Sequence, residues 1–231
     1  MNPLTESFRR TFHSAALACL SVMTLGVMGC SDDEAGSAGA SGESMSSEQF
    51  YAGLQSSDNY VPMTLDVMVE GASNVVLGRM VGVEEGVTIH YSGANYDDTV
   101  KTIVVELEAD EILAGTSETL YIGFPYFGRW PGLDSLKGAL PSQSMAVFVE
   151  PATWLEPDPN GDPEGVEFIN PGAGHPPGTV LTGLRTPQAL VIEGDGEVLQ
   201  PLEPGGEQLF LPSVATLADV ATAISGVMDG T

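Results

Sequence analysis

The run Asn74-Val75-Val76-Leu77-Gly78-Arg79-Met80-Val81-Gly82-Val83 is the first part of the chain with enough branched residues to predict a long central strand. Strand alternation places most of its apolar side chains on one face, namely those of Val75, Leu77, Val81 and Val83. Arg79 would break that face in a regular strand, whereas a β-bulge at Gly78 would restore the alternation. The run therefore predicts a strand that bends at Gly78 and serves two parts of a small barrel, with Val76 and Met80 on its second face.

Several later runs also have the character of strands. Lys101–Asp110 alternates between apolar and polar residues, which predicts a half-buried strand. Met145–Val149 is apolar throughout, which predicts a strand buried on both faces. The remaining predicted strands are Val87–Tyr91, Thr119–Phe124, Gln188–Ile192 and Val198–Leu202. The last two flank Asp195-Gly196, a pair typical of a hairpin turn.

Two helices are predicted at the ends of this β region. Thr64–Gly71 begins with a candidate N-cap and ends with a candidate glycine stop. Thr216–Met228 repeats apolar residues at helical intervals. We therefore expect residues 61–231 to form one mostly-β domain, a small OB-like antiparallel barrel with a short N-terminal helix and a C-terminal helix that caps one end of the sheet.

Three segments carry a resemblance to known proteins. They are Thr64–Val83, the Lys101–Gly115 strand ending in Glu-Ile-Leu-Ala-Gly, and Leu140-Pro141 leading into Ala146-Val147-Phe148-Val149-Glu150-Pro151. Their layout resembles a group of uncharacterised secreted bacterial proteins with an OB-like barrel, and it is similar to the netrin-like domains of the tissue inhibitors of metalloproteinases. The resemblance implies a barrel. It does not imply protease inhibition, because those inhibitors present a free N-terminal cysteine to the protease metal and contain disulfide cysteines that are missing here.

The first thirty residues have the order of an export signal. Arg9 and Arg10 precede an apolar run, Ser14–Met28, that is short for a membrane span. The run ends in Val27-Met28-Gly29-Cys30, which resembles a bacterial lipobox. The resemblance implies that residues 1–29 are a lipoprotein signal peptide and that Cys30 is the lipid attachment site, anchoring the protein to a membrane on the periplasmic or cell-surface face.

Two alternatives remain for this segment. The first is an ordinary signal that is cut near Ala38-Gly39-Ala40, with Cys30 incidental. The second concerns the export route, because Phe8-Arg9-Arg10-Thr11-Phe12 also resembles the twin-arginine signal, which carries folded proteins. In either case residues 30–60 are expected to be a flexible acidic linker, since Ser31–Gln49 contains Met45 as its only large apolar residue.

The composition excludes several classes of protein. The chain has 7 Lys and Arg against 32 Asp and Glu, and removal of residues 1–29 would leave a formal net charge of 5 − 31 = −26. Such a surface repels phosphates, so we exclude DNA and RNA as partners. A hydrophobic content of 42% is too high for intrinsic disorder, and 28 Gly and 16 Pro argue against a helical bundle.

Aromatic residues gather in one short region and form a candidate binding loop. The set is Tyr121, Phe124, Tyr126, Phe127 and Trp130. Exposed rings offer a large rigid contact area to a sugar or a peptide at small entropic cost. The alternative is that the rings seal one end of the barrel, and sequence alone favours the seal.

The segment Asp158–Glu167 is the candidate metal site. Its oxygen-bearing side chains are those of Asp158, Asn160, Asp162, Glu164 and Glu167, a ligand type that calcium prefers. It departs from an EF-hand, because Pro163 stands where that loop needs glycine and Ile169 where it needs glutamate. An exposed acidic loop without metal is the simpler interpretation.

The sequence after residue 29 lacks the catalytic and cofactor-binding motifs for which it was compared. After residue 29 the histidines are His90 and His175, with no nucleophile elbow and no zinc-protease helix motif around them. Gly172–Gly178 contains two prolines and no following helix, so it should not hold a phosphate. We therefore expect no cofactor and a non-catalytic binding or structural role in the bacterial cell envelope, with an unknown envelope protein or glycan as partner. An exported hydrolase or a calcium-binding accessory protein is the alternative.

Overall fold

The computed structural model describes residues 45–54, 62–94, 96–126, 132–194, 197–202 and 214–230. Residues 44–231 form one compact unit. The predicted signal peptide, Cys30 and most of the predicted linker lie outside the described residues. The same holds for Phe127, Trp130 and the predicted turn at Asp195-Gly196.

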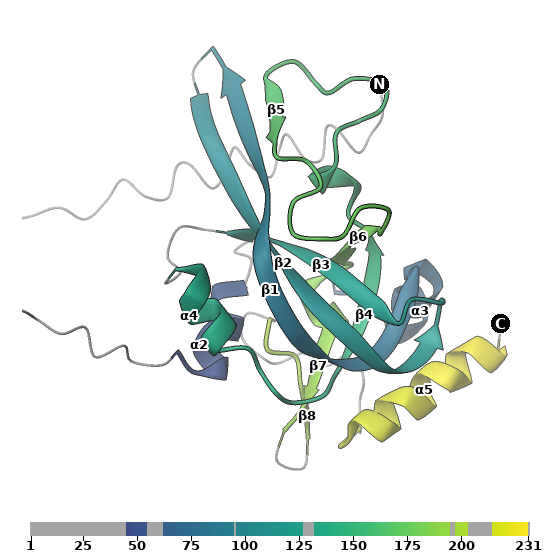
Figure 1. Cartoon of the computed structure of the whole chain (residues 1–231). Coiled ribbons are helices and arrows are strands. Elements are labelled where there is room, and N and C mark those ends of the chain that lie inside the picture. The colour runs from purple at the N-terminus through teal and green to yellow at the C-terminus, as the bar shows by residue number, and fades with distance from the viewer. Residues whose placement is uncertain are drawn as a thin grey trace, which may run out of the picture. The chain divides into compact units, whose positions relative to one another are not determined.

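One mixed sheet of eight strands dominates the domain (Figure 1). Its strands are β1 (Asn74–Gly93), β2 (Tyr96–Ala114), β3 (Thr119–Tyr126), β4 (Met145–Pro151), β5 (Val166–Ile169), β6 (Leu181–Leu184), β7 (Leu190–Glu193) and β8 (Val198–Leu199). The order across the sheet is β5-β1-β2-β3-β6-β4-β7-β8, and β1 also pairs with β4. Strands β1, β2, β3, β6 and β4 therefore close into a ring, which confirms the predicted OB-like barrel. The β3–β6 pair is parallel, so the sheet is not antiparallel throughout.

Strand β1 bends where the sequence predicts. Its register with β2 shifts between Leu77 and Gly78, and residues before the shift also pair with β4. A Cβ at Gly78 would collide with the main-chain carbonyl of Glu108, so only glycine fits. Met80 shares the ring interior with Val76 as predicted, but the predicted face of Val81 and Val83 is wrong, because another register shift lies between Met80 and Gly82. As a result Val81 is 41% exposed, and Val83 joins the interior of the ring.

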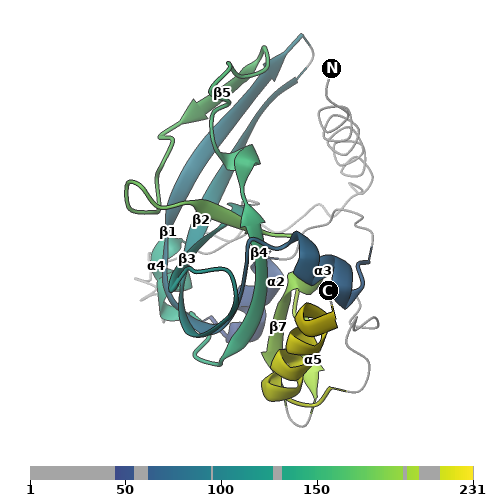
Figure 2. The ribbon, with the colours of Figure 1, turned by 90° about the vertical axis from the view of Figure 1, so that its right-hand side faces the viewer.

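Beyond the ring, β1 and β2 continue as a long hairpin, called the arm below (Glu84–Gly93 with Tyr96–Val104). The predicted separate strand Val87–Tyr91 is a continuation of β1, and strand pairing extends along the arm as far as Gly93 and Tyr96. Strand β5 pairs with the arm at Thr88–Tyr91 (Figure 2). The arm is covered on one face, so Thr102 and Val104 of the predicted half-buried strand are in fact buried.

The interior of the ring is filled by apolar side chains from its strands, including Val76, Val105, Ile122, Met145, Val147 and Val149, and Leu190 of β7 belongs to the same cluster. Strand β4 is buried on both faces as predicted, because Ala146 and Phe148 point outward into a second cluster. That second cluster lies under α3 (Leu65–Gly71) and α5 (Leu217–Gly230), which are the two predicted helices. Helix α5 begins with a reciprocal capping box between Thr216 and Asp219.

Helix α2 (Ser47–Leu54) is a correction to the predicted 30–60 linker. Phe50, Tyr51 and Leu54 are buried in the ring-interior cluster, together with Leu136 of α4 (Leu133–Gly138). The missed signal is the capping box Ser46-Ser47-Glu48-Gln49, in which Gln49 Oε1 accepts from the Ser46 N–H at 2.8 Å and Ser46 Oγ accepts from the Gln49 N–H at 3.2 Å. The Ser- and Gly-rich composition of the preceding tract predicts a linker, yet the short helix that follows it contributes three residues to the core.

The remaining short elements are η1 (Thr153–Leu155) and η2 (Pro187–Ala189). The predicted hairpin of β7 and β8 is confirmed, since Ile192 pairs with Leu199 and Glu193 with Val198. Among the residues that the structure describes, none of the helices is both long and apolar enough to cross a membrane.

Candidate functional site

The predicted aromatic loop is a strand over its described part. Tyr121, Phe124 and Tyr126 all lie on β3, where strand alternation sends Tyr121 and Phe124 to opposite faces. Phe124 is buried in the interior of the ring, as the seal interpretation requires. Tyr121 instead packs against a third apolar cluster, which includes Val87 and Val104 of the arm. The described members of the set therefore do not form one platform.

Tyr121 is nonetheless the centre of a mixed polar and aromatic surface on the outside of β3. Its direct neighbour on β2 is Glu106. Burial and the charge of Glu106, which also accepts a hydrogen bond from the phenol, raise the pKa of Tyr121. The ring of His175 lies over the same surface, with its centroid 6.2 Å from that of Tyr121. A half-buried ring, a carboxylate and an imidazole thus meet at one place, called the Tyr121 surface below.

The hydrogen bond between His175 and Thr179 defines the roles of the two ring nitrogens. The Thr179 hydroxyl donates to the Pro176 carbonyl at 2.7 Å, so its single proton is used there. Its contact with His175 Nδ1 at 3.0 Å therefore has the imidazole as donor. In the neutral ring this leaves Nε2 as an acceptor for a ligand hydroxyl or amide.

The loop that carries His175 is held against the arm by a close approach. Gly174 has a φ of +86°, and a Cβ there would lie 2.6 Å from Val104 Cγ2. Neighbouring aromatic residues that the sequence analysis did not select are Tyr91, Trp154 and Phe168, all of which pack against the cluster that Tyr121 contacts. They come from β1, η1 and β5, which are separate segments of the chain, so no local pattern connects them.

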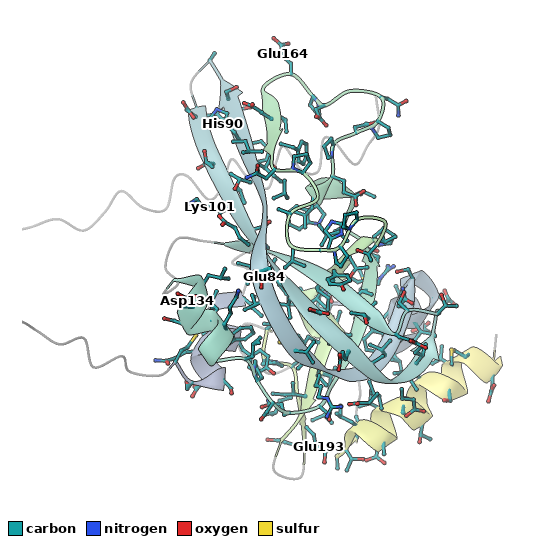
Figure 3. All side chains as sticks on the ribbon, viewed as in Figure 1. Glu84, His90, Lys101, Asp134, Glu164 and Glu193 are labelled. Carbon is teal, nitrogen blue, oxygen red and sulfur yellow. The ribbon has the colours of Figure 1, made fainter. Side chains whose placement is uncertain are left out.

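The predicted calcium ligands lie in the loop between η1 and β5 and on β5 itself. Asp158 and Asp162 are used by the loop, because Asp158 Oδ1 accepts from the Asn160 N–H and Asp162 Oδ1 accepts from the Asp158 N–H, each at 2.8 Å. Glu164 projects from the outer end of the loop and Glu167 faces His90 across the β1–β5 pair (Figure 3). Over the described ranges, no group of three or more His, Cys, Asp or Glu side chains could hold a metal ion.

The second histidine, His90, has a separate set of partners on the arm. Its Nδ1 lies 3.2 Å from Thr99 Oγ1, and its Nε2 lies 3.7 Å from Asp97 Oδ1. His175 bonds to Thr179 on another loop. The structure therefore gives the two histidines separate partners, and the hydrolase alternative gains no support from them.

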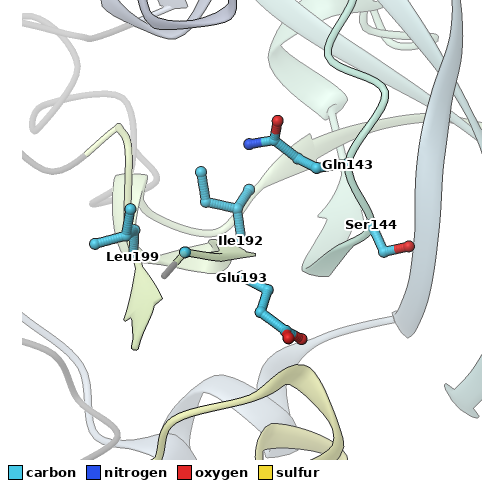
Figure 4. A pocket seen from close by; sticks show the side chains of 6 residues that line it. Gln143, Ser144, Ile192, Glu193 and Leu199 are labelled. Carbon is cyan, nitrogen blue, oxygen red and sulfur yellow. The ribbon is translucent and has the colours of Figure 1, made fainter. Parts of the chain in front are cut away.

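Two surface hollows lie apart from the Tyr121 surface on the described part of the domain. The larger, with a volume of about 660 Å³, lies between the start of β4 and the β7–β8 hairpin and is lined by Gln143, Ser144, Ile192, Glu193, Gly194 and Leu199 (Figure 4). The Glu193 carboxylate in this hollow already has a structural role, because its Oε2 accepts a hydrogen bond from the Leu217 N–H at the start of α5, at 3.1 Å. The smaller hollow, about 480 Å³, is bordered by acidic residues of β2 and by Glu118.

Comparison of the chain with protein-family models, with curated proteins and with solved structures finds no match.

Proposed function

We propose that the protein is a lipid-anchored protein of the bacterial cell envelope, with a barrel domain that has a non-catalytic binding role. The observation that carries the proposal is the order of the chain: a charged start, an apolar run, Cys30 at the end of that run, and then a separate folded domain. The chain has 2 cysteines, Cys19 within the apolar run and Cys30 at its end. After cleavage before Cys30, the mature chain would carry one thiol, placed at its N-terminus for acylation.

The arrangement of the domain supports this proposal. The described domain holds three hydrophobic clusters, so it needs no disulfide to be stable. The capping box at Ser46 begins the first described helix, only a short polar tract after Cys30. An extended tract of that length reaches at most about 3.5 Å per residue, so the barrel would work close to the membrane surface.

Fatty-acid labelling tests the anchor. Cells expressing the wild-type chain, Cys30→Ser or Cys19→Ser are grown with an alkynyl fatty acid, and the purified proteins are analysed for label. We expect label in the wild type and in Cys19→Ser, and none in Cys30→Ser. Label that persists in Cys30→Ser would overturn the proposal, whereas Cys19→Ser controls for the loss of a cysteine as such.

The Tyr121 surface is the part of the barrel that best supports binding, and we propose a hydroxyl-rich ligand such as an envelope glycan. Rings stack on the apolar faces of sugars, while a carboxylate and an imidazole nitrogen accept hydroxyl protons. Glu106, Tyr121 and His175 bring these groups together on one outer face.

Co-sedimentation with purified cell-wall polysaccharide tests the ligand class. We expect Tyr121→Ala to lower the bound fraction at least about tenfold, in line with the loss of a central aromatic contact. Tyr96→Ala is the matched control, because Tyr96 is 53% exposed and lies at the far end of the arm. Equal binding by the two variants, with unchanged circular dichroism, would reject the Tyr121 surface as the site.

A further inference from the structure

Helix α2 differs from the rest of the ring interior in how it is held. Strands wall the sides of a small barrel, so a helix reaches the interior only where strand pairing stops. Phe50, Tyr51 and Leu54 do reach it, with exposures of 0%, 4% and 6%. A helix of 8 residues is too short to be stable in water by itself, so α2 exists because these side chains are docked.

The docking of α2 buries a polar atom of Tyr51 in this apolar cluster. Tyr51 is the member of the interior cluster that carries a polar side-chain atom, and its hydroxyl has no hydrogen-bond partner among the residues that the structure describes. A buried donor without a partner loses the hydrogen bonds that water would supply. The same burial raises the pKa of Tyr51. Release of α2 returns this hydroxyl to water, whereas the surrounding strands lose their paired backbone bonds if they open.

We infer that α2 is a releasable plug of the barrel: it can leave the ring interior while the strands stay paired. The sequence around it fits such a movement. The tract between α2 and α3 is Gln55-Ser56-Ser57-Asp58-Asn59-Tyr60-Val61-Pro62-Met63-Thr64, which is mostly polar and can be solvated. Release exposes the apolar side chains that α2 covers, among them those of the cluster around Phe124 and Leu136.

Release of α2 would also change the distance that the barrel can reach from Cys30. Residues 47–61 would join the connection between Cys30 and the barrel, and each extended residue adds about 3.5 Å of reach. The domain would then have a short and a long tether, with the apolar opening of the ring exposed only in the long form. This consequence rests on the lipid anchor proposed above, whereas the release of α2 does not.

Native-state hydrogen exchange on the full protein, purified as it is produced in cells, tests the plug. We expect the amides of Phe50–Leu54 to exchange at least about tenfold faster than those of Val147 and Val149, through an opening that spares the strands. Tyr51→Phe removes the unpartnered hydroxyl and should slow α2 exchange about tenfold, with no change in β4. Tyr96→Phe, at an exposed tyrosine, should change neither rate.

Three results would overturn the inference. The first is exchange of the α2 amides at the same rate as β4, which would make the helix a fixed part of the core. The second is an equal slowing of both segments by Tyr51→Phe, because that outcome reports global unfolding alone. The third is an unchanged α2 rate in Tyr51→Phe. The measurement reads the barrel domain only, so a failed lipid-labelling experiment leaves its interpretation intact.

Discussion

Outside the interior of the ring, the sheet is covered in two different ways. Over β4 and β7, helices α3 and α5 supply side chains at regular spacing, and Met68, Val220 and Ile224 are buried there. Over the arm, the cover is the irregular segment 152–181, which reaches the strands through Leu155, Leu181 and a loop that approaches with its backbone. A sheet face can thus be buried by periodic side chains or by close main-chain contact, and the two should respond differently to mutation.

The largest effect is expected in the helical cover. Ile224 is fully buried between α5 and the sheet, so Ile224→Ala should lower the free energy of unfolding by about 2–5 kcal/mol through lost burial and a cavity. Val67→Ala on α3 is the control, because Val67 is 44% exposed and its truncation should change stability by about 0.5 kcal/mol or less. Urea denaturation measures both, and similar losses for the two variants would show that α5 does not bury this face.

The loop that covers the arm should be destabilised by the single methyl group that Gly174→Ala adds. Gly174→Ala imposes both an unfavourable backbone conformation and a contact with Val104, whereas Gly172→Ala, with a φ of +80° and no atom within 4 Å, imposes the backbone effect alone. We expect Gly172→Ala to lower the free energy of unfolding by about 1–2 kcal/mol. Gly174→Ala should lower it by a further amount of about 1–3 kcal/mol, because the added methyl group overpacks against Val104. Equal losses would mean that the loop does not rest on the arm.

The smallest effect concerns acid stability at the start of α5. Bonds from the Thr216 hydroxyl and from the N–H groups of Ala215 and Thr216 lower the pKa of Asp219. The stability that ionised Asp219 adds to the folded state is therefore present above the pKa of the unfolded chain, about 3.9. It is lost as the pH falls through the lower pKa of the folded state.

Thermal unfolding between neutral and acidic pH measures this contribution. The stability advantage of wild type over Asp219→Asn should shrink in acid, and Thr216→Ala should remove part of the pH dependence because the hydroxyl is the main cause of the lowered pKa. An advantage that stays constant with pH would contradict the assigned capping box.

Local pattern predicts the helical cover better than the loop cover. The α5 periodicity and the unbroken run Met145–Val149 are properties of single segments, and both elements form as expected. The cover of the arm depends on contacts between segments far apart in the chain, such as Gly174 with Val104, which no local pattern encodes. The register shift at Gly78 in β1 is followed by another between Met80 and Gly82, so the bend at Gly78 is predictable but the exposure of Val81 is not.

The candidate site shows the same division. Tyr121 and Phe124 are close in sequence and suggest one aromatic loop, but strand alternation separates them. His175 and Glu106, which meet Tyr121 in space, lie on a distant loop and on the neighbouring strand. In α2, by contrast, the signal was local, since the Ser46–Gln49 capping box precedes Phe50.

Closure of the ring joins segments that are far apart along the chain. The hydroxyl of Ser73 donates to the carbonyl of Val149, 76 positions later, and that of Thr182 donates to the carbonyl of Tyr121, 61 positions earlier. Folds dominated by such high contact order form slowly, because long loops must close before their contacts stabilise them. We therefore expect the domain to fold slowly, limited by the closure of the β1–β4 and β3–β6 pairs.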